Sequence, residues 1–278
     1  MSLKIDLHCH STVSDGVLSP DQVVARARAN GVQVLALTDH DETGGLGIAS
    51  DYAQDAGIHF VPGVEVSVTW AGHTVHIVGL GIAADDATLN AGLERVRSGR
   101  RERARTMAER LGKLGFPGAY DGAMAFVSNP ELISRTHFAR FLVQEGHCRN
   151  MQQVFERYLG DHKPAHVPVQ WATLEQAVSW IHTAGGMAVI AHPGRYDYTP
   201  VQFDGLCTTF KDLGGQGIEV VTGSHHPDEY ATYARVAKHY GFLASVGSDF
   251  HGPDESRMEL GDLPPLPSGL TPVWHDWF

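Results

Sequence analysis

Short apolar segments alternate with amphipathic helical segments along most of this 278-residue chain. Apolar strands that alternate with helices are typical of parallel β/α units. About seven strands at this length predict a closed or nearly closed α/β barrel. An open doubly wound sheet is the alternative, but its phosphate-binding glycine motif is absent. The expected strands are Leu3–His8, Val34–Thr38, Phe60–Val66, Thr74–Leu80, Met187–His192, Gly217–Val221 and Leu243–Gly247, and the intervening helices include Pro20–Asn30, Leu46–Ala56, Leu174–Ala184 and Pro227–Tyr240.

The alternation stops between residues 85 and 168, where the pattern is helical. We therefore expect a barrel made of residues 1–84 and 169–278, with a helical insertion at 85–168. Its first long helix, expected over Glu94–Leu114, carries eight basic and three acidic residues. Arg100 falls on the apolar stripe of that helix. Two interpretations stay open, a solvated helix with one snorkelling arginine and a basic helix that covers a site for anions.

The net charge of −11 argues against a broad nucleic-acid surface, which normally has a basic balance. No run of 18 apolar residues suggests a membrane span. The first expected strand begins at Leu3, which leaves no room for a secretory leader. Three cysteines without paired spacing suit a reducing compartment. We expect a cytoplasmic protein without an obligate protein partner.

Histidine is unusually frequent, with 17 residues, and many histidines follow the expected strands. Functional groups of parallel barrels gather at the carboxyl ends of strands. Residues i and i+2 of a strand face the same way, about 6.6 Å apart. The side chains of His8 and His10, or of Asp249 and His251, can therefore converge on one ion. Six strand ends carry His, Asp or Glu in this way, which predicts a multinuclear metal site at one end of the barrel.

These segments resemble the motifs of the PHP (polymerase and histidinol phosphatase) family of the amidohydrolase superfamily. The quoted motifs are His8-Cys9-His10, Thr38-Asp39-His40, Ala191-His192-Pro193 and Ser248-Asp249-Phe250-His251. The resemblance implies a distorted (β/α)7 barrel with two to three divalent ions, Mn²⁺ first and Fe²⁺ or Zn²⁺ as alternatives. It implies one ion at His8, His10, Glu65 and Asp249, a second at Glu65, His76 and His192, and a third at Asp15, His40 and His251.

Charge arithmetic agrees with phosphate chemistry. Three divalent ions and three carboxylates leave roughly three positive charges if the imidazoles are neutral. Such a site attracts an anion, and a hydroxide that bridges two ions is a ready nucleophile. Asp249 or His251 would assist the leaving group. We therefore expect a metal-dependent phosphatase, a phosphoric monoester hydrolase.

Two segments supply candidate phosphate ligands. Arg135 follows Ser134, a possible helix N-cap, and Arg195 follows His192-Pro193-Gly194. A guanidinium makes a forked contact with phosphate. We expect substrate contacts from Ser134, Arg135, His137, Arg195, Arg100, Arg101 and His225, with surface or packing roles as the alternatives.

The same segments resemble a stand-alone PHP branch of 3′,5′-nucleoside bisphosphate phosphatases and short-RNA 5′-exonucleases. This resemblance implies removal of the 3′-phosphate from a molecule such as adenosine 3′,5′-bisphosphate, giving AMP. The expected partner is a small phosphorylated nucleotide or a short oligoribonucleotide. Two other hypotheses are a histidinol phosphate phosphatase and a noncatalytic metal-binding scaffold. The complete set of nine candidate ligands argues against the scaffold.

Overall fold

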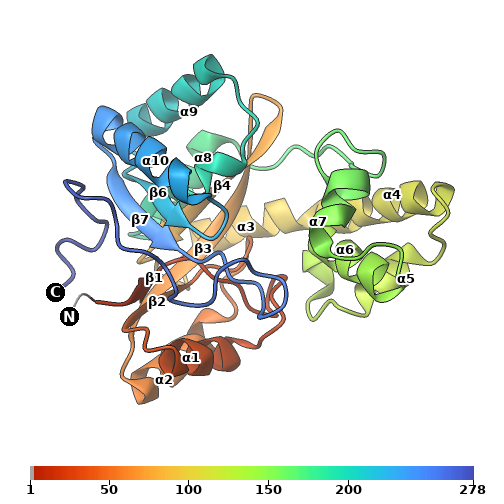
Figure 1. The fold of residues 1–278 in the computed structure, drawn as a ribbon, viewed down its shortest axis with the longest axis horizontal. Helices are drawn as coiled ribbons and strands as arrows, with labels where there is room; N and C mark the ends of the chain where they lie inside the picture. The colour runs from red at the N-terminus through yellow and green to blue at the C-terminus, as the bar shows by residue number, and fades with distance from the viewer. Residues whose placement is uncertain (1–2) are drawn as a thin grey trace.

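The computed structural model describes residues 3–278, and its centre is a seven-stranded barrel (Figure 1). Neighbouring strands pair in chain order, and the barrel closes between the last and the first. There the Leu7 N–H donates to the carbonyl of Val246 at 3.1 Å, and the Asp249 N–H donates to that of His8 at 2.9 Å. The predicted α/β barrel is thus confirmed. Its strands are β1 (Ile5–Asp6), β2 (Val34–Leu37), β3 (His59–Trp70), β4 (His73–Leu80), β5 (Met187–Ile190), β6 (Gly217–Thr222) and β7 (Leu243–Gly247).

Strand β4 runs antiparallel to both of its neighbours, β3 and β5. The expectation of parallel β/α units is therefore wrong at this place. Ala71 and Gly72 join β3 to β4 with φ angles of 46° and 83°. Two successive positive φ angles are what a tight two-residue hairpin turn requires. Because β4 is reversed, its first half lies at the rim where the parallel strands end, and that half contains His76.

Some strands end earlier or later than the apolar pattern predicted. β1 ends at Asp6 and β5 at Ile190, so His8 and His192 lie in the segments that follow these strands. β3 continues to Trp70, and Glu65 lies within the strand as expected. These bounds put the candidate ligands at one end of the barrel, on loops and on strand positions alike.

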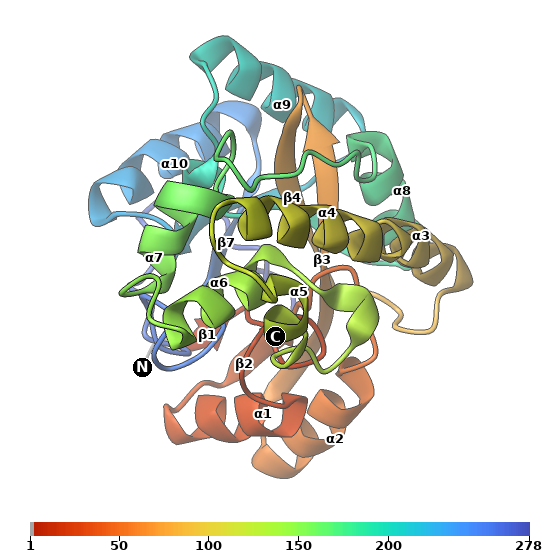
Figure 2. The ribbon, with the colours of Figure 1, turned by 90° about the vertical axis from the view of Figure 1, so that its right-hand side faces the viewer.

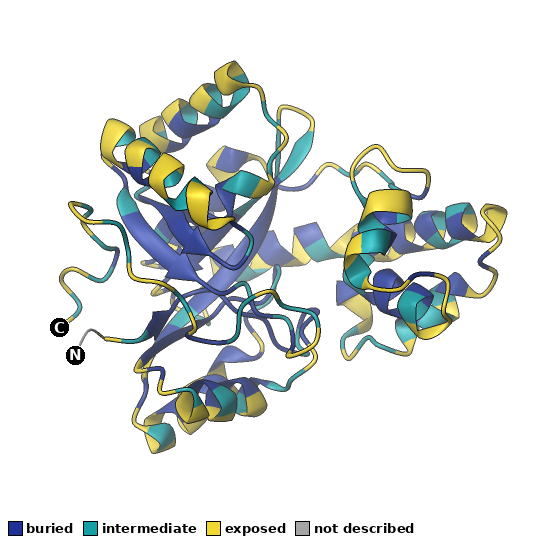
Figure 3. Ribbon diagram, viewed as in Figure 1, coloured by how far each residue is buried: buried dark blue, intermediate teal, exposed yellow. Residues whose placement is uncertain are grey.

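Helices cover the outside of the barrel. Two of them begin with a hydroxyl residue followed by proline, at Ser19 and Thr199, which suits the first turn of a helix. Figure 3 shows that their outer faces are exposed while the strands are buried. These helices are α1 (Pro20–Ala29), α2 (Leu46–Ala56), α8 (Leu174–Thr183), α9 (Pro200–Asp212) and α10 (Pro227–Tyr240).

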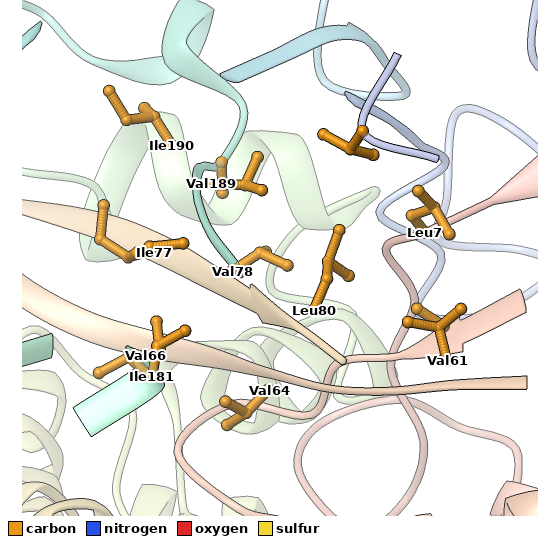
Figure 4. Packing of buried hydrophobic residues seen from close by; sticks show 14 of the residues in the cluster. Leu7, Val61, Val64, Val66, Ile77, Val78, Leu80, Ile181, Val189 and Ile190 are labelled. Atoms are coloured by element: carbon orange, nitrogen blue, oxygen red, sulfur yellow. The ribbon is translucent and has the colours of Figure 1, made fainter. Parts of the chain in front are cut away.

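Aliphatic side chains of β3, β4 and β5 pack together with Ile181 of α8 (Figure 4). Val64, Val66, Ile77 and Val78 are at most 1% exposed. Burial of one such side chain contributes about 1.5–3 kcal/mol. This packing provides a rigid frame for the polar groups at the rim.

The predicted long helix over residues 94–114 is instead two helices, α3 (Ala87–Ser98) and α4 (Arg100–Lys113), separated at Gly99. Glycine is a weak helix former, and here it allows a break between the two segments. α3 packs on the barrel, because its buried residues Leu89 and Leu93 belong to the barrel core. Figure 1 shows α3 leading from the barrel to α4.

The helices after Gly99 bury an apolar core of their own, which extends from Ala104 to Ala165. No strand occurs between residues 85 and 168. Figure 2 shows these helices in front of one end of the barrel. In the described part of the chain, no helix is both long and apolar enough to span a membrane. The insertion comprises α4, α5 (Ala119–Met124), η1 (Pro130–Leu132), α6 (Arg135–Gln144), α7 (Met151–Val154) and the π-helical turn η2 (Phe155–Leu159).

Candidate active site

The nine predicted metal ligands lie together at the rim of the barrel. Their ligand atoms form four groups, and within each group all the atoms lie within 4.8 Å of one another. Four residues each belong to two groups, so the groups form one continuous cluster. The groups are His10, Asp15, His40 and His251; His8, His10 and Asp249; His8, Glu65 and His192; and His40, Glu65 and His76.

Glu65 lies among five imidazoles. Its Oε1 is 2.9 Å from His192 Nε2, 3.0 Å from His76 Nδ1 and 3.4 Å from His8 Nε2. Its Oε2 is 2.8 Å from His40 Nδ1. Burial raises the pKa of Glu65, but the surrounding imidazoles outweigh it and hold that pKa well below its ordinary value. The carboxylate is therefore ionised and central, as expected of a bridging ligand.

Asp249 and Asp15 lie on the other side of the cluster. Asp249 Oδ1 is 3.4 Å from His10 Nε2, and Asp15 Oδ1 is 3.4 Å from His251 Nε2. His8 Nε2 and His10 Nε2 are 3.2 Å apart, so the two side chains converge as their i, i+2 spacing predicted. In the intervening Cys9, the buried thiol donates to the carbonyl of Ala36 and packs away from the cluster.

Several buried ligand atoms of the cluster make no hydrogen bond within the protein, which is what the ligand atoms of a metal-binding site would show. His10 Nδ1, Asp15 Oδ1 and His192 Nδ1 are buried without a hydrogen-bond partner. The same holds for Glu65 Oε2, because its approach to His40 Nδ1 does not have the geometry of a hydrogen bond. Such groups are costly unless something else satisfies them. Burial, with repulsion from nearby cationic groups, lowers the pKa of His10 to about 3 and that of His192 to about 3. The neutral imidazoles of His10 and His192, beside ionised carboxylates such as Glu65, fit divalent Mn, Fe or Zn.

A cavity of about 260 Å³ lies beside the cluster, between the barrel rim and the insertion. Asp15, His40, His76, Asp249 and His251 form part of its wall. Five guanidinium groups also line it, those of Arg100, Arg103, Arg135, Arg195 and Arg257. The cavity thus combines candidate metal ligands with a high density of positive charge.

Arg100 is only 5% exposed, so its interpretation as a snorkelling residue of a solvated helix is wrong. Its guanidinium donates to the carboxylate of Asp41 and, at 3.1 Å, to Ser67 Oγ. It also lies over the ring of Trp171, at 4.8 Å from the centroid. Arg101 points elsewhere: its side chain is 53% exposed near Glu131, outside the cavity lining.

Arg103 was not singled out in the sequence, although it lies one helical turn after Arg100. It is 8% exposed and lies over Trp171 at 5.2 Å. Its Nε donates to the carbonyl of Val167 at 3.0 Å, and no carboxylate in residues 3–278 pairs with it. Burial and repulsion from Arg135 and Arg100 lower the pKa of Arg103 to about 9. It is thus a buried cation that lines the cavity without a counter-ion.

The start of α6 connects the insertion to the cluster. Ser134 is its N-cap, as predicted, and accepts from the Thr136 N–H at 3.2 Å. The Ser134 hydroxyl also donates to Asp15 Oδ2 at 3.1 Å. His137 Nδ1 accepts from the Ser134 N–H at 3.0 Å, and the ring is 1% exposed and outside the cavity lining. Arg135 lines the cavity and pairs with Asp161 at 2.9 Å.

Asp249 presents its two oxygens to different partners. Oδ1 faces His8 and His10, whereas Oδ2 is 3.2 Å from Arg195 Nη1 and accepts from Ser224 Oγ at 2.8 Å. Arg195 is 48% exposed, so its side chain combines contact with the cluster and access to the cavity. Ser224 carried no sequence signal.

His225 is not brought to the cavity. It is 2% exposed, which also rules out a surface-loop position, and its ring stacks on Tyr233 with centroids 4.5 Å apart. Its Nδ1 is 3.2 Å from the carbonyl of Val220. Its Nε2 accepts from the Gly194 N–H at 2.9 Å. Both ring nitrogens are therefore used within the protein.

Comparisons with known proteins agree with this geometry. The model of the PHP domain family matches residues 6–199. A 3′,5′-nucleoside bisphosphate phosphatase of Chromobacterium violaceum is 52% identical over 98% of this chain and 95% of its own length. A 5′-3′ exoribonuclease of Haemophilus influenzae is 44% identical over 99% of both chains. The solved structure of a C. violaceum amidohydrolase with bound sulfate and no metal superposes with a TM-score of 0.95, at 52% identity, covering 98% of this chain and 95% of that one. This chain belongs to the PHP domain family.

Proposed function

We propose that this protein is a metal-dependent phosphatase that removes the 3′-phosphate from nucleoside 3′,5′-bisphosphates. The observation that carries the proposal is the meeting, in one cavity, of nine candidate metal ligands and several guanidinium groups. A substrate with two phosphates needs two cationic subsites. The named activity of the C. violaceum relative supports the same substrate class.

The ligand set would hold two to three divalent ions, with Mn²⁺ the first choice and Fe²⁺ or Zn²⁺ the alternatives. When bound, the ions would lower the pKa of a water molecule and polarise the phosphoryl oxygens of the 3′-phosphate. Glu65 and Asp249 would supply ionised oxygens that hold the ions. Arg195, next to Asp249 Oδ2, orients the same phosphate. Asp249 and His251 line the cavity and are our candidates for assisting departure of the 3′-oxygen.

Arginines of the insertion would hold the 5′-phosphate. Arg103 lacks a carboxylate partner, so an incoming phosphate supplies the counter-ion that this buried cation lacks. Arg135 has donors beyond the one that Asp161 accepts. Arg100 lies over the same Trp171 ring as Arg103, but it is already paired with Asp41. Phe155 and Met151 add apolar surface for the nucleoside.

A 5′-exonuclease acting on short RNA is the second candidate. The H. influenzae relative carries that name, and RNA with a 5′-phosphate has the same spacing between its first two phosphates. Histidinol phosphate has a single phosphate and would leave the arginines of the insertion without a role. The negative net charge favours a small nucleotide or a short strand over long nucleic acid.

The test compares kcat/KM of the Mn²⁺-loaded protein for adenosine 3′,5′-bisphosphate, histidinol phosphate and a 5′-phosphorylated trinucleotide. We expect inorganic phosphate to be released fastest from the bisphosphate. Faster turnover of histidinol phosphate would overturn the nucleotide assignment, and faster loss of the 5′-nucleotide from RNA would make the exonuclease the main activity. Metal analysis of the purified protein identifies the ions.

We also propose a cytoplasmic location. Cys9, Cys148 and Cys207 are buried free thiols, and free thiols suit a reducing compartment. Fractionation of the native host checks this.

A further inference from the structure

Glu219 is a buried acid that neither the metal set nor the cavity includes. It lies on β6 and is 1% exposed, in a strand whose other residues are uncharged. Its Oε1 is 2.7 Å from His8 Nδ1, and its Oε2 accepts from the His192 N–H at 2.6 Å. A carboxylate is costly to bury unless its oxygens are paired, and both oxygens are paired here. Its partners are two of the predicted metal ligands.

The first contact determines which nitrogen of His8 carries the proton. An ionised carboxylate only accepts hydrogen bonds, so the proton of a neutral His8 lies on Nδ1. The lone pair of Nε2 is then free, and Nε2 faces His10 Nε2 at 3.2 Å and Glu65 Oε1 at 3.4 Å. A metal-binding imidazole commonly donates its other N–H to a carboxylate, which fixes both tautomer and orientation.

The second contact holds the backbone of His192. This residue has φ 25° and ψ 59°, a backbone conformation that residues other than glycine rarely adopt. The hydrogen bond from its N–H to Glu219 stabilises that conformation. The His192 ring then reaches Glu65, with Nε2 2.9 Å from Oε1. One carboxylate thus supports two ligands that are 184 positions apart in the chain.

The neighbouring strand leaves room for this arrangement. A Cβ atom at Gly247 would lie 3.1 Å from Glu219 Oε1, closer than ordinary contact, and would clash with His8. The register between β6 and β7 also shifts between Glu219 and Val221. Such bulges occur next to active sites, where they redirect a side chain.

We propose that Glu219 is a positioning residue of the metal cluster, which keeps the His8 proton on Nδ1 and fixes the backbone of His192. The proposal rests on the proposed metal centre. Glu219 itself would contact neither the ions nor the substrate, and would act through His8 and His192.

The test is Glu219→Gln, which keeps the shape but offers one acceptor where two donors must be satisfied. Either the amide NH₂ opposes the His192 N–H, or it donates to His8 Nδ1 and moves the imidazole proton to Nε2. Glu229→Gln is the matched control, because Glu229 accepts from the His226 N–H at 2.6 Å outside the cavity lining. We expect Glu219→Gln to lower Mn²⁺ affinity, measured by calorimetry, by roughly 10- to 100-fold. The control should bind as the wild type does.

A second readout needs no metal. In ¹⁵N-histidine spectra of the metal-free wild type, His8 Nδ1, identified by the absence of its signal from His8→Gln, should carry a proton, because Glu219 Oε1 lies 2.7 Å from it. An Nε2–H tautomer in the wild type overturns the proposal, even if Glu219→Gln does not fold. Undiminished Mn²⁺ affinity in a folded Glu219→Gln protein also overturns it. Failure of the wild type to bind Mn²⁺ is a different result, because it rejects the metal centre itself.

Discussion

His225 Nε2 accepts a hydrogen bond from the N–H of Gly194, and this contact joins the loop after β6 to the loop after β5. The second loop carries Arg195, one position further along. The imidazole is held in turn by Tyr233 and by the carbonyl of Val220. His225 therefore acts on the cavity through the position of a neighbouring loop.

Replacement of His225 distinguishes this positioning role from direct substrate binding. His225→Gln retains an acceptor for the Gly194 N–H, whereas His225→Ala does not. We expect Ala to lower kcat/KM for the bisphosphate by about tenfold, corresponding to about 1.4 kcal/mol, and Gln to lower it less. Equal losses in the two variants would show that the hydrogen bond to Gly194 does not position the loop and that packing of the ring on Tyr233 does.

Arg135→Ala should weaken turnover of the bisphosphate far more than hydrolysis of a small artificial monoester. Loss of a hydrogen bond to a charged group costs about 1.5–3 kcal/mol, or roughly 10- to 150-fold in kcat/KM. The monoester has no second phosphate for Arg135 to hold. Arg101→Ala, on the exposed side of α4, is the control and should leave both rates unchanged. An equal loss on both substrates would contradict the proposed role.

His192→Ala separates an enzyme from a metal-binding scaffold. Mn²⁺ at 100 times its Kd should stabilise the wild type by about 2.7 kcal/mol over the chelator-treated protein. The variant should remain folded, gain less from Mn²⁺ and release phosphate at least about 100-fold more slowly, because one ligand of the Glu65 group is lost. Collapse of the variant, together with a wild type that never releases phosphate, would support the scaffold.

His137 should make the metal-free protein less stable in mild acid. Burial lowers its pKa to about 4, from about 6.5 in the unfolded chain. As the pH falls from 6.5 towards 4, the unfolded chain gains a proton that the folded chain does not, so stability is lost in that window. Urea unfolding with a chelator present measures the free energy of unfolding at each pH. Between pH 7 and pH 5, this free energy should fall by about 2 kcal/mol less in His137→Gln than in the wild type. If the free energy of unfolding depends on pH in the same way in both proteins, the pKa of His137 does not differ between the folded and the unfolded chain.

Two helix glycines should respond oppositely to alanine. A Cβ atom at Gly92 of α3 would lie 2.5 Å from the Trp180 indole of α8, and overpacking of this kind costs about 1–3 kcal/mol. At Gly112 of α4 no heavy atom lies within 4 Å of an added Cβ. Gly112→Ala should therefore raise the free energy of unfolding by about 0.5–1 kcal/mol. Thermal unfolding measures both. If Gly92→Ala leaves the unfolding temperature unchanged, α3 is not tightly packed on the barrel.

Strand periodicity and residue type are local properties, so they predicted the barrel and a cluster of His, Asp and Glu side chains at its rim. The choice of the nine residues that lie together came from the resemblance to the PHP family. The sequence did not predict the direction of β4, since an apolar run reads the same for either direction. The available signal was Ala71-Gly72 between two long apolar runs, a loop length that suits a hairpin. The break at Gly99 was missed for a similar reason, because one glycine does not interrupt a helical pattern.

Contacts between distant segments were the least predictable part. The pairing of Arg100 with Asp41, and the position of Arg103 over Trp171, depend on how the insertion packs on the barrel. An acid within the apolar run of β6 was a visible signal for Glu219, but its two partners are set only by barrel closure. Propensity and periodicity carry no information on such contacts.

The helical insertion has an apolar core of its own, and it contributes none of the nine clustered ligands. Three of the arginines that line the cavity come from it. Under the proposed function, the metal ligands and most of the groups that hold the second phosphate are therefore encoded in separate stretches of sequence. Exchange of the insertion for another helical module would then change which phosphorylated molecules fit the cavity and leave the nine ligands in place.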